Sequence, residues 1–371
     1  MRIVFFAPAF PGKHDTSHYA FVKQLVDAIA DKGNECHVVA PYNVFHYKKI
    51  VRGIEKYFIG NSEVIVHRPY YLSFSSVKGS KWLAHITRKN ALRKAEKQLP
   101  AGMDVVYCHF WNSGYDGYQY AKTKGIPLFV ATGESDIKSF FSPPADMEDF
   151  KDYVNGVICV SSKNRDESIK LGLTNKEKCG VFPNAVNSDL FHKQDKVLCR
   201  KQLGLPLDSY IVAFVGWFKE RKGPLRVAEA IDRVGNVNSL FIGKGEQVPQ
   251  CNGILFKGAL PHEKVPFYLG AADCFVLPTL HEGCCNAVVE AMACGLPIIS
   301  SNLSFNWDVL DDTNSIMVDP NSVCEIADAI RILRDDLQLR NRLSEGALRK
   351  AAELTIDQRA EKILEFMKSR F

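Results

Sequence analysis

Apolar runs with the length of β-strands alternate with amphipathic, helix-like runs along the sequence, and this alternation constrains the fold more than any other feature. Strands that alternate with helices form parallel sheets, because a parallel pair needs a long crossover connection. In the first half the predicted strands are residues 3–7, 36–40, 64–67, 105–108, 128–131 and 156–160. The pattern begins again in the second half, at residues 210–215, 238–242, 254–257, 274–277 and 297–300. The sequence therefore predicts an α/β protein built from two similar halves.

The length of 371 residues suits two domains of about 100–200 residues each. A polar stretch with Pro206 separates the two halves and is predicted to be a linker. The last residues carry apolar side chains at helical spacing after a complete second domain. The expected order is an N-terminal domain 1–187, a linker 188–207, a C-terminal domain 208–355, and a helix 356–371 that crosses back to the N-terminal domain.

The formal net charge of +5 is unevenly distributed. Residues 41–100 contain 12 Lys or Arg and three Glu, a net charge of +9, which indicates an anionic partner. Within this region the segment 77–97 is basic and amphipathic. Two interpretations remain open for it: a helix that lies on an anionic membrane surface, or a helix packed on the core with a solvated cationic face. Nucleic acid is not an expected partner, because no recognised binding module accompanies the charge.

The cysteine pattern indicates reduced thiols and a cytoplasmic protein. The chain has 11 cysteines with no Cys-x-x-Cys pair, which predicts neither a disulfide framework nor a zinc ribbon. No apolar run approaches the 18 residues of a membrane-spanning helix, and no signal-peptide core is present at the start. No Asp-x-Asp triplet occurs, so no metal site is expected.

Residues 278–297 predict a strand end, a tight loop and a short helix, and they are the most informative stretch of the chain. Asn286 is predicted to cap the helix, and the free N–H groups around Cys285 to Ala287 offer a phosphate site. Glu282 and Glu290 lie eight positions apart, so both can flank one bound ligand and accept hydrogen bonds from its hydroxyls. The alternative is that Glu282 is a solvated loop residue and Glu290 a helix-surface acid.

The run Glu-Gly…Glu-Ala-Met-Ala-x-Gly-x-Pro, with its Glu-x7-Glu spacing, resembles the family-4 retaining glycosyltransferases of GT-B fold. Further stretches that match this family are 183–187 with Phe191, 215–223, 242–245, 256–258 and 272–273. The resemblance implies two Rossmann-like domains facing a cleft, with a nucleotide-sugar donor held mainly by the second and an acceptor by the first. It also implies a role in building bacterial surface polysaccharides or glycolipids.

The resemblance implies donor-site roles for residues of the second half. Glu282 would bind the donor sugar and Lys222 the diphosphate, whereas Trp217 stands where the family usually has an arginine. Lys219 or Arg221 would have to replace the missing charge. The loop 243–245 lacks the spacing of a phosphate-binding loop and is predicted to be a turn. The predicted donor-binding set is Glu290, Gly216, Trp217, Arg221, Gly283, Cys284, Cys285, Asn286, Ala287, Phe256, Lys257 and Gly12.

The resemblance likewise assigns residues of the first half. It places His109 opposite the transferred sugar, as a catalytic residue with Glu282 and Lys222, and the alternative is a structural histidine at a strand end. Glu134, Asp136 and His18 are the predicted acceptor-side residues. Glu134 or Asp136 would orient or deprotonate the acceptor hydroxyl, although a simple helix-capping role is the competing interpretation for Asp136.

Together these observations predict a retaining hexosyltransferase. It would move a hexose or acetamido-hexose from a nucleotide-diphosphate sugar, with UDP as the expected nucleotide, to a hydroxyl of a lipid-linked or polysaccharide acceptor. No cofactor or metal is expected, and the protein would be cytoplasmic, with a peripheral position on the cytoplasmic face of the inner membrane. The alternatives are a non-catalytic nucleotide-sugar-binding or regulatory subunit on the same scaffold, and another GT-B enzyme such as a sugar-nucleotide epimerase.

Overall fold

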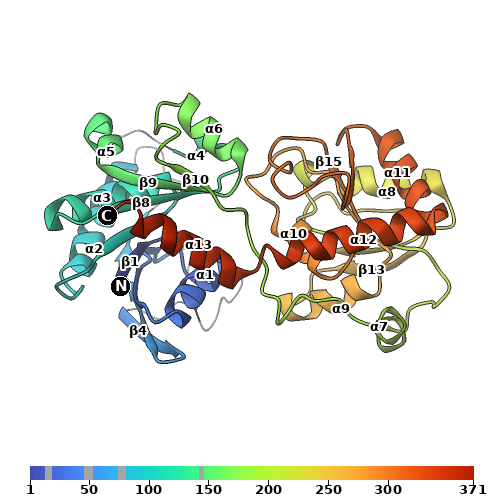
Figure 1. Ribbon diagram of the computed structural model, residues 1–371, viewed down its shortest axis with the longest axis horizontal. Helices are drawn as coiled ribbons and strands as arrows, with labels where there is room; N and C mark the ends of the chain where they lie inside the picture. Colours follow the sequence, from blue (N-terminus) through green and yellow to red (C-terminus); the bar gives the residue numbers. More distant parts are fainter. Residues whose placement is uncertain (13–18, 46–52, 74–80, 142–145) are drawn as a thin grey trace. The chain divides into compact units, whose positions relative to one another are not determined.

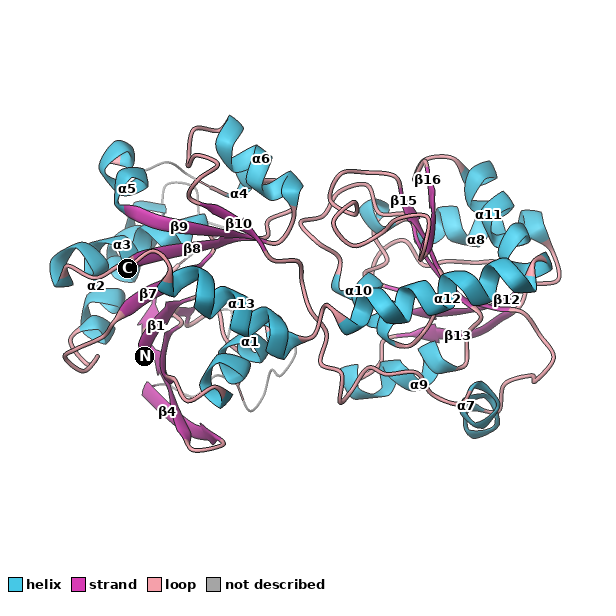
Figure 2. Ribbon diagram, in the orientation of Figure 1, coloured by secondary structure: helices cyan, strands magenta, loops and turns pink. Residues whose placement is uncertain are grey.

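The structure is a computed structural model that describes residues 1–12, 19–45, 53–73, 81–141 and 146–371. The chain divides into two compact units, one formed by Met1–Phe182 with Arg359–Phe371 and the other by Pro183–Gln358. Figures 1 and 2 show that the strands of each unit lie among surrounding helices. The predicted α/β architecture is confirmed, with a largely parallel sheet in the first unit and a fully parallel one in the second.

The first unit contains an eight-stranded sheet in the order β10-β9-β8-β7-β1-β2-β5-β4. Its strands are β1 (Arg2–Phe6), β2 (Glu35–Val39), β4 (Gly53–Ile59), β5 (Ser62–Arg68), β7 (Val105–His109), β8 (Leu128–Thr132), β9 (Val154–Cys159) and β10 (Cys179–Val181). All neighbouring pairs are parallel except the β4–β5 pair at one edge. Beyond this sheet, β3 (Tyr42–Asn43) pairs in parallel with β6 (Tyr70–Tyr71).

Helices cover this sheet, and the longer ones among them bury an apolar face. They are α1 (Ala20–Asp31), α2 (Lys81–Glu96), α3 (Trp111–Lys124), α4 (Ile137–Phe140), α5 (Met147–Tyr153) and α6 (Ser162–Lys170). In the core, the side chains of Trp111 and Tyr118 from α3 pack with Phe150 of α5. The C-terminal helix α13 (Ile356–Lys368) places Phe366 against Phe129 and Phe182, so most of this helix belongs to the first unit.

The second unit contains a six-stranded, fully parallel sheet in the order β13-β12-β11-β14-β15-β16. Its strands are β11 (Ile211–Val215), β12 (Asn238–Ile242), β13 (Ile254–Gly258), β14 (Cys274–Leu277), β15 (Ile298–Ser301) and β16 (Ser315–Val318). Its helices are α7 (Lys196–Leu203), α8 (Pro224–Val234), α9 (Val265–Gly270), α10 (Asn286–Ala293), α11 (Val323–Asp335) and α12 (Leu337–Ala352), with short 3₁₀ turns η1 (Glu220–Lys222) and η2 (His262–Lys264). Since the strands are parallel, all their carboxyl ends lie at one edge of the sheet.

The structure differs from the predicted linker 188–207, because this segment contains α7 and belongs to the second unit. The Asp195 side chain caps α7, and Gly204 ends it in the left-handed conformation. The buried Arg200 guanidinium donates hydrogen bonds to the Asp273 carboxylate at 2.7 Å and to the Ala271 carbonyl at 2.9 Å. These contacts attach the segment to the second unit, whose first residue is Pro183.

Candidate functional site

Most of the predicted donor residues, all of them in the second unit, gather at the carboxyl edge of its sheet. β11, β12 and β14 are adjacent strands, and they are followed respectively by the segments 216–223, 243–246 and 278–285. The Leu280 amide donates a hydrogen bond to the Arg221 carbonyl at 2.8 Å, which joins the segments that follow β11 and β14. Open α/β sheets bind ligands at such an edge.

Glu282 forms the centre of a charged cluster at this edge. Its carboxylate forms ion pairs with both Arg221 and Lys222. The Arg221 guanidinium also donates a hydrogen bond to the His281 carbonyl. The Lys222 side chain is buried, and its ammonium lies 3.7 Å from the Cys285 sulfur. Burial opposes the charge of this ammonium, but the Cys285 sulfur and the Glu282 carboxylate outweigh burial and raise the pKa of Lys222. The cluster therefore carries two cations against one carboxylate.

Glu290 lies on α10 and pairs with a residue that the sequence interpretation missed. The His262 Nε2 lies 2.9 Å from the Glu290 carboxylate, and the His262 ring packs on Phe191 at 5.0 Å between centroids. The hydrogen bond to Glu290 raises the pKa of the His262 imidazole, against the effect of partial burial. Each of the two predicted glutamates thus has a basic partner in the structure.

The start of α10 differs in one detail from the prediction. Cys285 occupies the N-cap position and makes no side-chain capping hydrogen bond, whereas the predicted cap, Asn286, is the first helical residue. The Asn286 side chain instead accepts a hydrogen bond from the Asn184 side chain at 2.7 Å. Asn184 also donates to the Cys284 carbonyl at 2.9 Å and so fixes the loop before the helix. The first N–H groups of α10, at Asn286 and Ala287, have no acceptor within the helix.

The remaining donor-side predictions have different surroundings. Gly216 follows β11 directly, and the side chain of Trp217 is 53% exposed. Phe256 is half-buried, and its ring contacts the tilted ring of Tyr268, with centroids 4.7 Å apart. Lys257 is exposed and donates to the Pro249 carbonyl at 3.0 Å. The contacts of Phe256 and Lys257 fit their alternative interpretation as an ordinary strand end.

His109 ends β7 in the first unit and is buried, with 3% of its surface exposed. Burial, with a smaller contribution from the Arg359 charge, lowers its pKa to about 3, so the imidazole is neutral near pH 7. Its ring packs near the rings of Tyr107, Phe110 and Phe21, at centroid distances of 5.0, 5.7 and 6.1 Å. The described residues offer no hydrogen-bond partner to its Nδ1 atom.

Glu134 lines a pocket of about 380 Å³ in the first unit. Its carboxylate accepts hydrogen bonds from the Thr132 hydroxyl at 2.7 Å, the Gly133 amide at 2.9 Å and the Trp111 amide at 3.3 Å. Burial raises the pKa of this carboxyl, although the hydrogen bonds oppose that effect. The other lining residues are Pro8, Tyr19, Phe21, Phe110, Asn112, Ser113, Gly133 and Ser135. The pocket combines aromatic walls with one oriented carboxylate.

Asp136, Gly12 and His18 complete the sequence-based set in the first unit. Asp136 caps α4 by accepting hydrogen bonds from the Ser139 amide and hydroxyl, which matches its alternative interpretation. The Ser139 hydroxyl lowers the pKa of the Asp136 carboxyl. Gly12 lies beside the buried Arg68 guanidinium, which donates to the Phe10 and Pro11 carbonyls at 2.9 and 2.5 Å. His18 lies outside the described residues.

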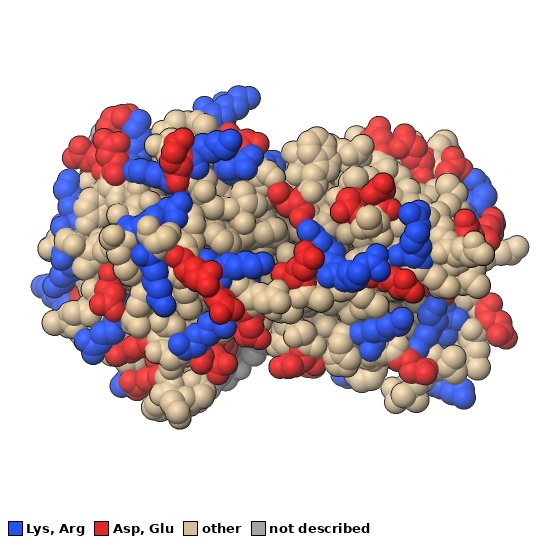
Figure 3. Space-filling model, in the orientation of Figure 1, with Lys and Arg blue, Asp and Glu red and all other residues tan. Residues whose placement is uncertain are grey.

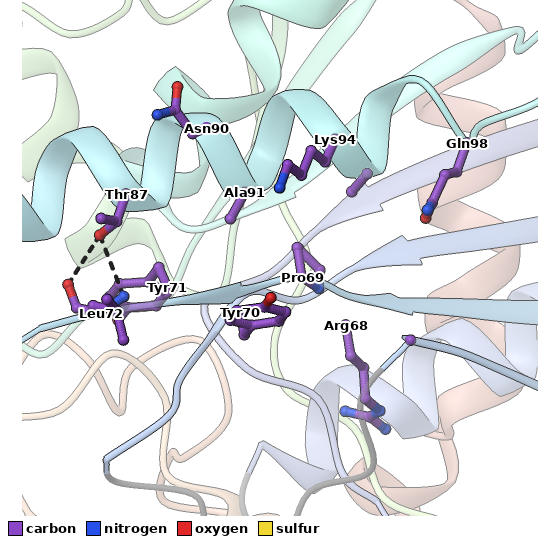
Figure 4. Close-up of a pocket in the computed structure, with 12 residues that line it drawn as sticks. Arg68, Pro69, Tyr70, Tyr71, Leu72, Thr87, Asn90, Ala91, Lys94 and Gln98 are labelled. Carbon is purple, nitrogen blue, oxygen red and sulfur yellow. Dashed lines mark hydrogen bonds between the residues drawn. The ribbon is translucent and has the colours of Figure 1, made fainter.

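A second groove in the first unit, of about 450 Å³, runs between α2 and the chain from Arg68 to Leu72 (Figure 4). Tyr70, Tyr71 and Leu72 form one wall, and Asn90 and Lys94 of α2 form part of the other. The Thr87 hydroxyl donates to the Leu72 carbonyl at 2.9 Å and accepts from its amide at 3.3 Å, which ties the two walls together. The sequence interpretation pointed to the charge of this region but not to a groove.

On the face shown in Figure 3, Lys and Arg side chains are interspersed with Asp and Glu. Within residues 1–12, 19–45, 53–73, 81–141 and 146–371, no group of three His, Cys, Asp or Glu side chains is arranged to hold a metal ion. Among the helices that the structure describes, none has the length and apolar character needed to cross a bilayer. All 11 cysteines are free thiols.

Comparisons with known proteins agree with this geometry. Residues 20–190 match the family model described as Glycosyltransferase Family 4, and residues 195–350 match the model described as Glycosyl transferases group 1. The chain is 27% identical, over 89% of its length and 88% of the relative's, to the Bacillus subtilis teichuronic acid biosynthesis protein TuaC. It is 28% identical to an Escherichia coli UDP-Gal:α-D-GlcNAc-diphosphoundecaprenol α-1,3-galactosyltransferase, over 63% of this chain and 67% of that protein.

A solved structure of Anabaena HepE in complex with UDP superposes on the whole chain and covers all of HepE, with a TM-score of 0.77 and 16% identity. This likeness shows the fold, and the two family models together account for most of both units. The two parallel sheets, the charged cluster at the end of β11 and the matching family models lead to one conclusion. The chain belongs to the family-4 glycosyltransferases of GT-B fold.

Proposed function

We propose that this glycosyltransferase moves a hexose or acetamido-hexose from a nucleotide-diphosphate sugar, with UDP as the nucleotide, to a hydroxyl of a lipid-linked or polysaccharide acceptor. The observation that carries the proposal is the cluster of Glu282, Arg221 and Lys222 beside the start of α10. The solved HepE structure is a complex with UDP, and the name of the E. coli relative specifies a UDP-sugar donor and a diphospholipid-linked acceptor. Both similarities support this assignment.

In the proposed reaction the second unit binds the donor. Lys222 and the amides of Asn286 and Ala287 hold the diphosphate, because both are positive groups at the carboxyl edge of the sheet. Glu282 accepts a hydrogen bond from a hydroxyl of the donor sugar, and Glu290 accepts from the ribose hydroxyls. When the diphosphate enters, it competes with Glu282 for Lys222 and Arg221, which frees carboxylate oxygens for the sugar.

Retention follows from same-face substitution. The bond between the anomeric carbon and the diphosphate oxygen breaks, and the acceptor oxygen forms its bond to the same face of that carbon. The acceptor proton passes to the departing diphosphate, so no covalent enzyme intermediate is needed. Catalysis then consists of positioning and leaving-group stabilisation by fixed charges. Because protein cations and helix amides supply these charges, we propose that the reaction needs no metal ion.

The first unit supplies the acceptor site in this proposal. The pocket of Glu134 accepts the reacting hydroxyl, with the carboxylate orienting its proton. The groove beside α2 holds a more distant part of the acceptor, because Lys94 and Asn90 can bind polar groups while Tyr70 and Tyr71 cover apolar or sugar-ring surface (Figure 4). A position on the cytoplasmic face of the inner membrane would give this groove access to lipid-linked acceptors.

The test is a panel of nucleotide sugars with wild type and Glu282→Ala, in which release of nucleoside diphosphate is measured with EDTA present and with or without a lipid extract. We expect release from one donor, stimulation by lipid, and loss in Glu282→Ala but not in Glu345→Ala, which changes an exposed glutamate of α12. Trp217, at a position where an arginine is expected, favours one rival function, a non-catalytic nucleotide-sugar-binding subunit. Binding of a nucleotide sugar without turnover on any acceptor would support that rival.

A further inference from the structure

An exposed tryptophan in the donor-binding unit has two lysines against its ring. The Lys219 ammonium lies 5.8 Å from the centroid of the Trp217 ring, and the Lys244 ammonium lies 5.5 Å from it. All three side chains are exposed. Trp217 and Lys219 follow β11, whereas Lys244 follows the neighbouring strand β12, so the group lies at the carboxyl edge of the parallel sheet.

The backbone keeps Lys244 in this place. The Phe218 amide donates to the Lys244 carbonyl at 2.8 Å, and Phe218 forms a parallel bridge with Gly245. A Cβ atom at Gly243 would collide with the Gly216 carbonyl oxygen, and one at Gly245 would collide with the Phe218 carbonyl oxygen. The two glycines are therefore required for the close approach of the loop that carries Lys244. The predicted turn at 243–245 also delivers a cation to the donor edge.

Without Lys219 and Lys244, the net positive charge at this edge is smaller than the negative charge of a bound diphosphate. Arg221 and Lys222 share the Glu282 carboxylate, which leaves a net charge of +1 for the three groups. A nucleotide-diphosphate sugar brings two negative phosphates. By contrast, neither Lys219 nor Lys244 has a carboxylate partner among the residues that the structure describes, so both remain available to an anion. Gly216 connects the two groups, because it lies beside both the Lys222 side chain and Gly243.

We propose that Lys219 and Lys244 form a second cationic contact for the donor diphosphate, with the Trp217 ring as the platform that positions them. The pair replaces the arginine that the family resemblance implies at position 217. A lysine ammonium near an aromatic face is attracted by the ring and keeps its other donors free for phosphate oxygens. This inference rests on the proposed function, because it takes a nucleoside diphosphate as the ligand.

Calorimetric binding of UDP, GDP and ADP, each compared with its monophosphate, tests the proposal with wild type, Lys219→Ala, Lys244→Ala and the double variant. We expect each single variant to bind the preferred diphosphate about 3- to 10-fold more weakly and the double variant to lose most of the preference for diphosphate over monophosphate. Affinity for the monophosphate should change less than twofold. Lys201→Ala, an exposed lysine of α7, is the matched control. Thermal unfolding checks that every variant is folded.

Trp217 provides the second arm of the experiment. Trp217→Arg in the double-variant background should restore diphosphate preference, because it returns a cation to this position. Trp217→Ala should weaken diphosphate binding, and Trp217→Phe should retain it. An unchanged preference for diphosphate over monophosphate in the double variant would overturn the proposal. If the double variant instead binds the mono- and diphosphate equally more weakly, the two lysines contact the nucleoside part of the ligand and the proposal is overturned as well. If wild type binds no nucleoside diphosphate at all, the proposed function fails together with this inference.

Discussion

At the scale of single residues, Glu282 is informative because its role in binding can be separated from its role in turnover. Its carboxylate neutralises part of the charge of Arg221 and Lys222 before a donor arrives. Glu282→Gln removes that negative charge and leaves both cations to the diphosphate. We therefore expect the affinity for nucleoside diphosphate to be retained or to increase, while kcat falls by about 100-fold or more.

Calorimetric Kd values for nucleoside diphosphate and steady-state kcat values measure the two effects separately. Glu345→Gln is the control for a change of charge away from the site. A large loss of nucleotide affinity in Glu282→Gln, with kcat unchanged, would show that the carboxylate supports the nucleotide and not the sugar.

The pair of Glu290 and His262 predicts a pH dependence of donor binding. Because Glu290 raises the pKa of His262, the imidazolium form is favoured while the pair is intact. A donor whose ribose hydroxyls bind the Glu290 carboxylate must displace His262 from it, and the His262 imidazolium then releases a proton. Donor affinity should therefore increase with pH across the titration of His262, by at most about tenfold per pH unit for one proton.

The measurement is the KM for the donor between pH 6 and pH 8 for wild type and His262→Gln. The variant should bind the donor with little dependence on pH in this range and more tightly than wild type at pH 6. Parallel pH profiles for the two proteins would mean that the ribose does not compete with His262 for Glu290.

At the scale of secondary-structure elements, α2 bears on both interpretations of the basic segment. Trp82 and Ile86 are 63% and 45% exposed near the start of the helix, and Lys89, Arg93 and Lys97 continue the same exposed stripe at helical spacing. Its buried residues include Leu92 and Ala95, which pack in the core of the first unit. The helix thus satisfies the core interpretation with one face and leaves a basic and apolar face exposed, and the membrane prediction rests on that exposed face.

We expect wild type to bind vesicles that contain phosphatidylglycerol and not vesicles of phosphatidylcholine alone. Each charge reversal at Lys89, Arg93 or Lys97 removes a positive charge and adds a negative one, so it should weaken binding by about 2 kcal/mol, and Trp82→Ser should weaken it further. Flotation with the vesicles measures this, and charge reversal at Lys201 of α7 serves as the control. Equal flotation of wild type and of a variant with Lys89, Arg93 and Lys97 all reversed in charge would leave only the core-packing role for α2.

The sequence predicts central elements better than edge elements, and local contacts better than distant ones. The apolar runs at 3–7 and 105–108 correspond to β1 and β7, which are buried in the middle of the first sheet. The sequence does not predict β4 and β10, which lie at the two edges of that sheet and have no fully buried residue. His262 and Glu290 are 28 residues apart, so no local pattern could have paired them.

At the scale of the whole molecule, the chain consists of two compact units with separate cores, and each carries part of the proposed site. The nucleotide contacts proposed above all lie in Pro183–Gln358, whereas His67 and His109 lie buried in the other unit. Ligands that bind the folded state stabilise the unit that holds them. Nucleotide and acid should therefore act on different parts of the unfolding profile.

Burial lowers the pKa of His67 to about 4 and that of His109 to about 3, below the ordinary value of 6.5. Between the lowered pKa of each histidine and its ordinary pKa, the unfolded chain binds more protons than the folded one. The first unit therefore loses stability as pH falls below about 6.5. At pH 5 the loss is about 2 kcal/mol for each histidine. Buried carboxyls with raised pKa values, such as Glu134, act in the opposite direction, so variants are needed to isolate the histidines.

Scanning calorimetry at pH 7.5 and pH 5, with and without UDP, measures these effects. We expect acid to lower the unfolding temperature of one transition, and UDP to raise that of the other. His67→Gln should reduce the acid shift and leave the UDP shift unchanged, because the imidazole that must remain neutral in the folded unit is gone. A single transition that UDP and acid shift together would instead mean that the two units unfold as one cooperative structure, with the energy of nucleotide binding shared by both cores.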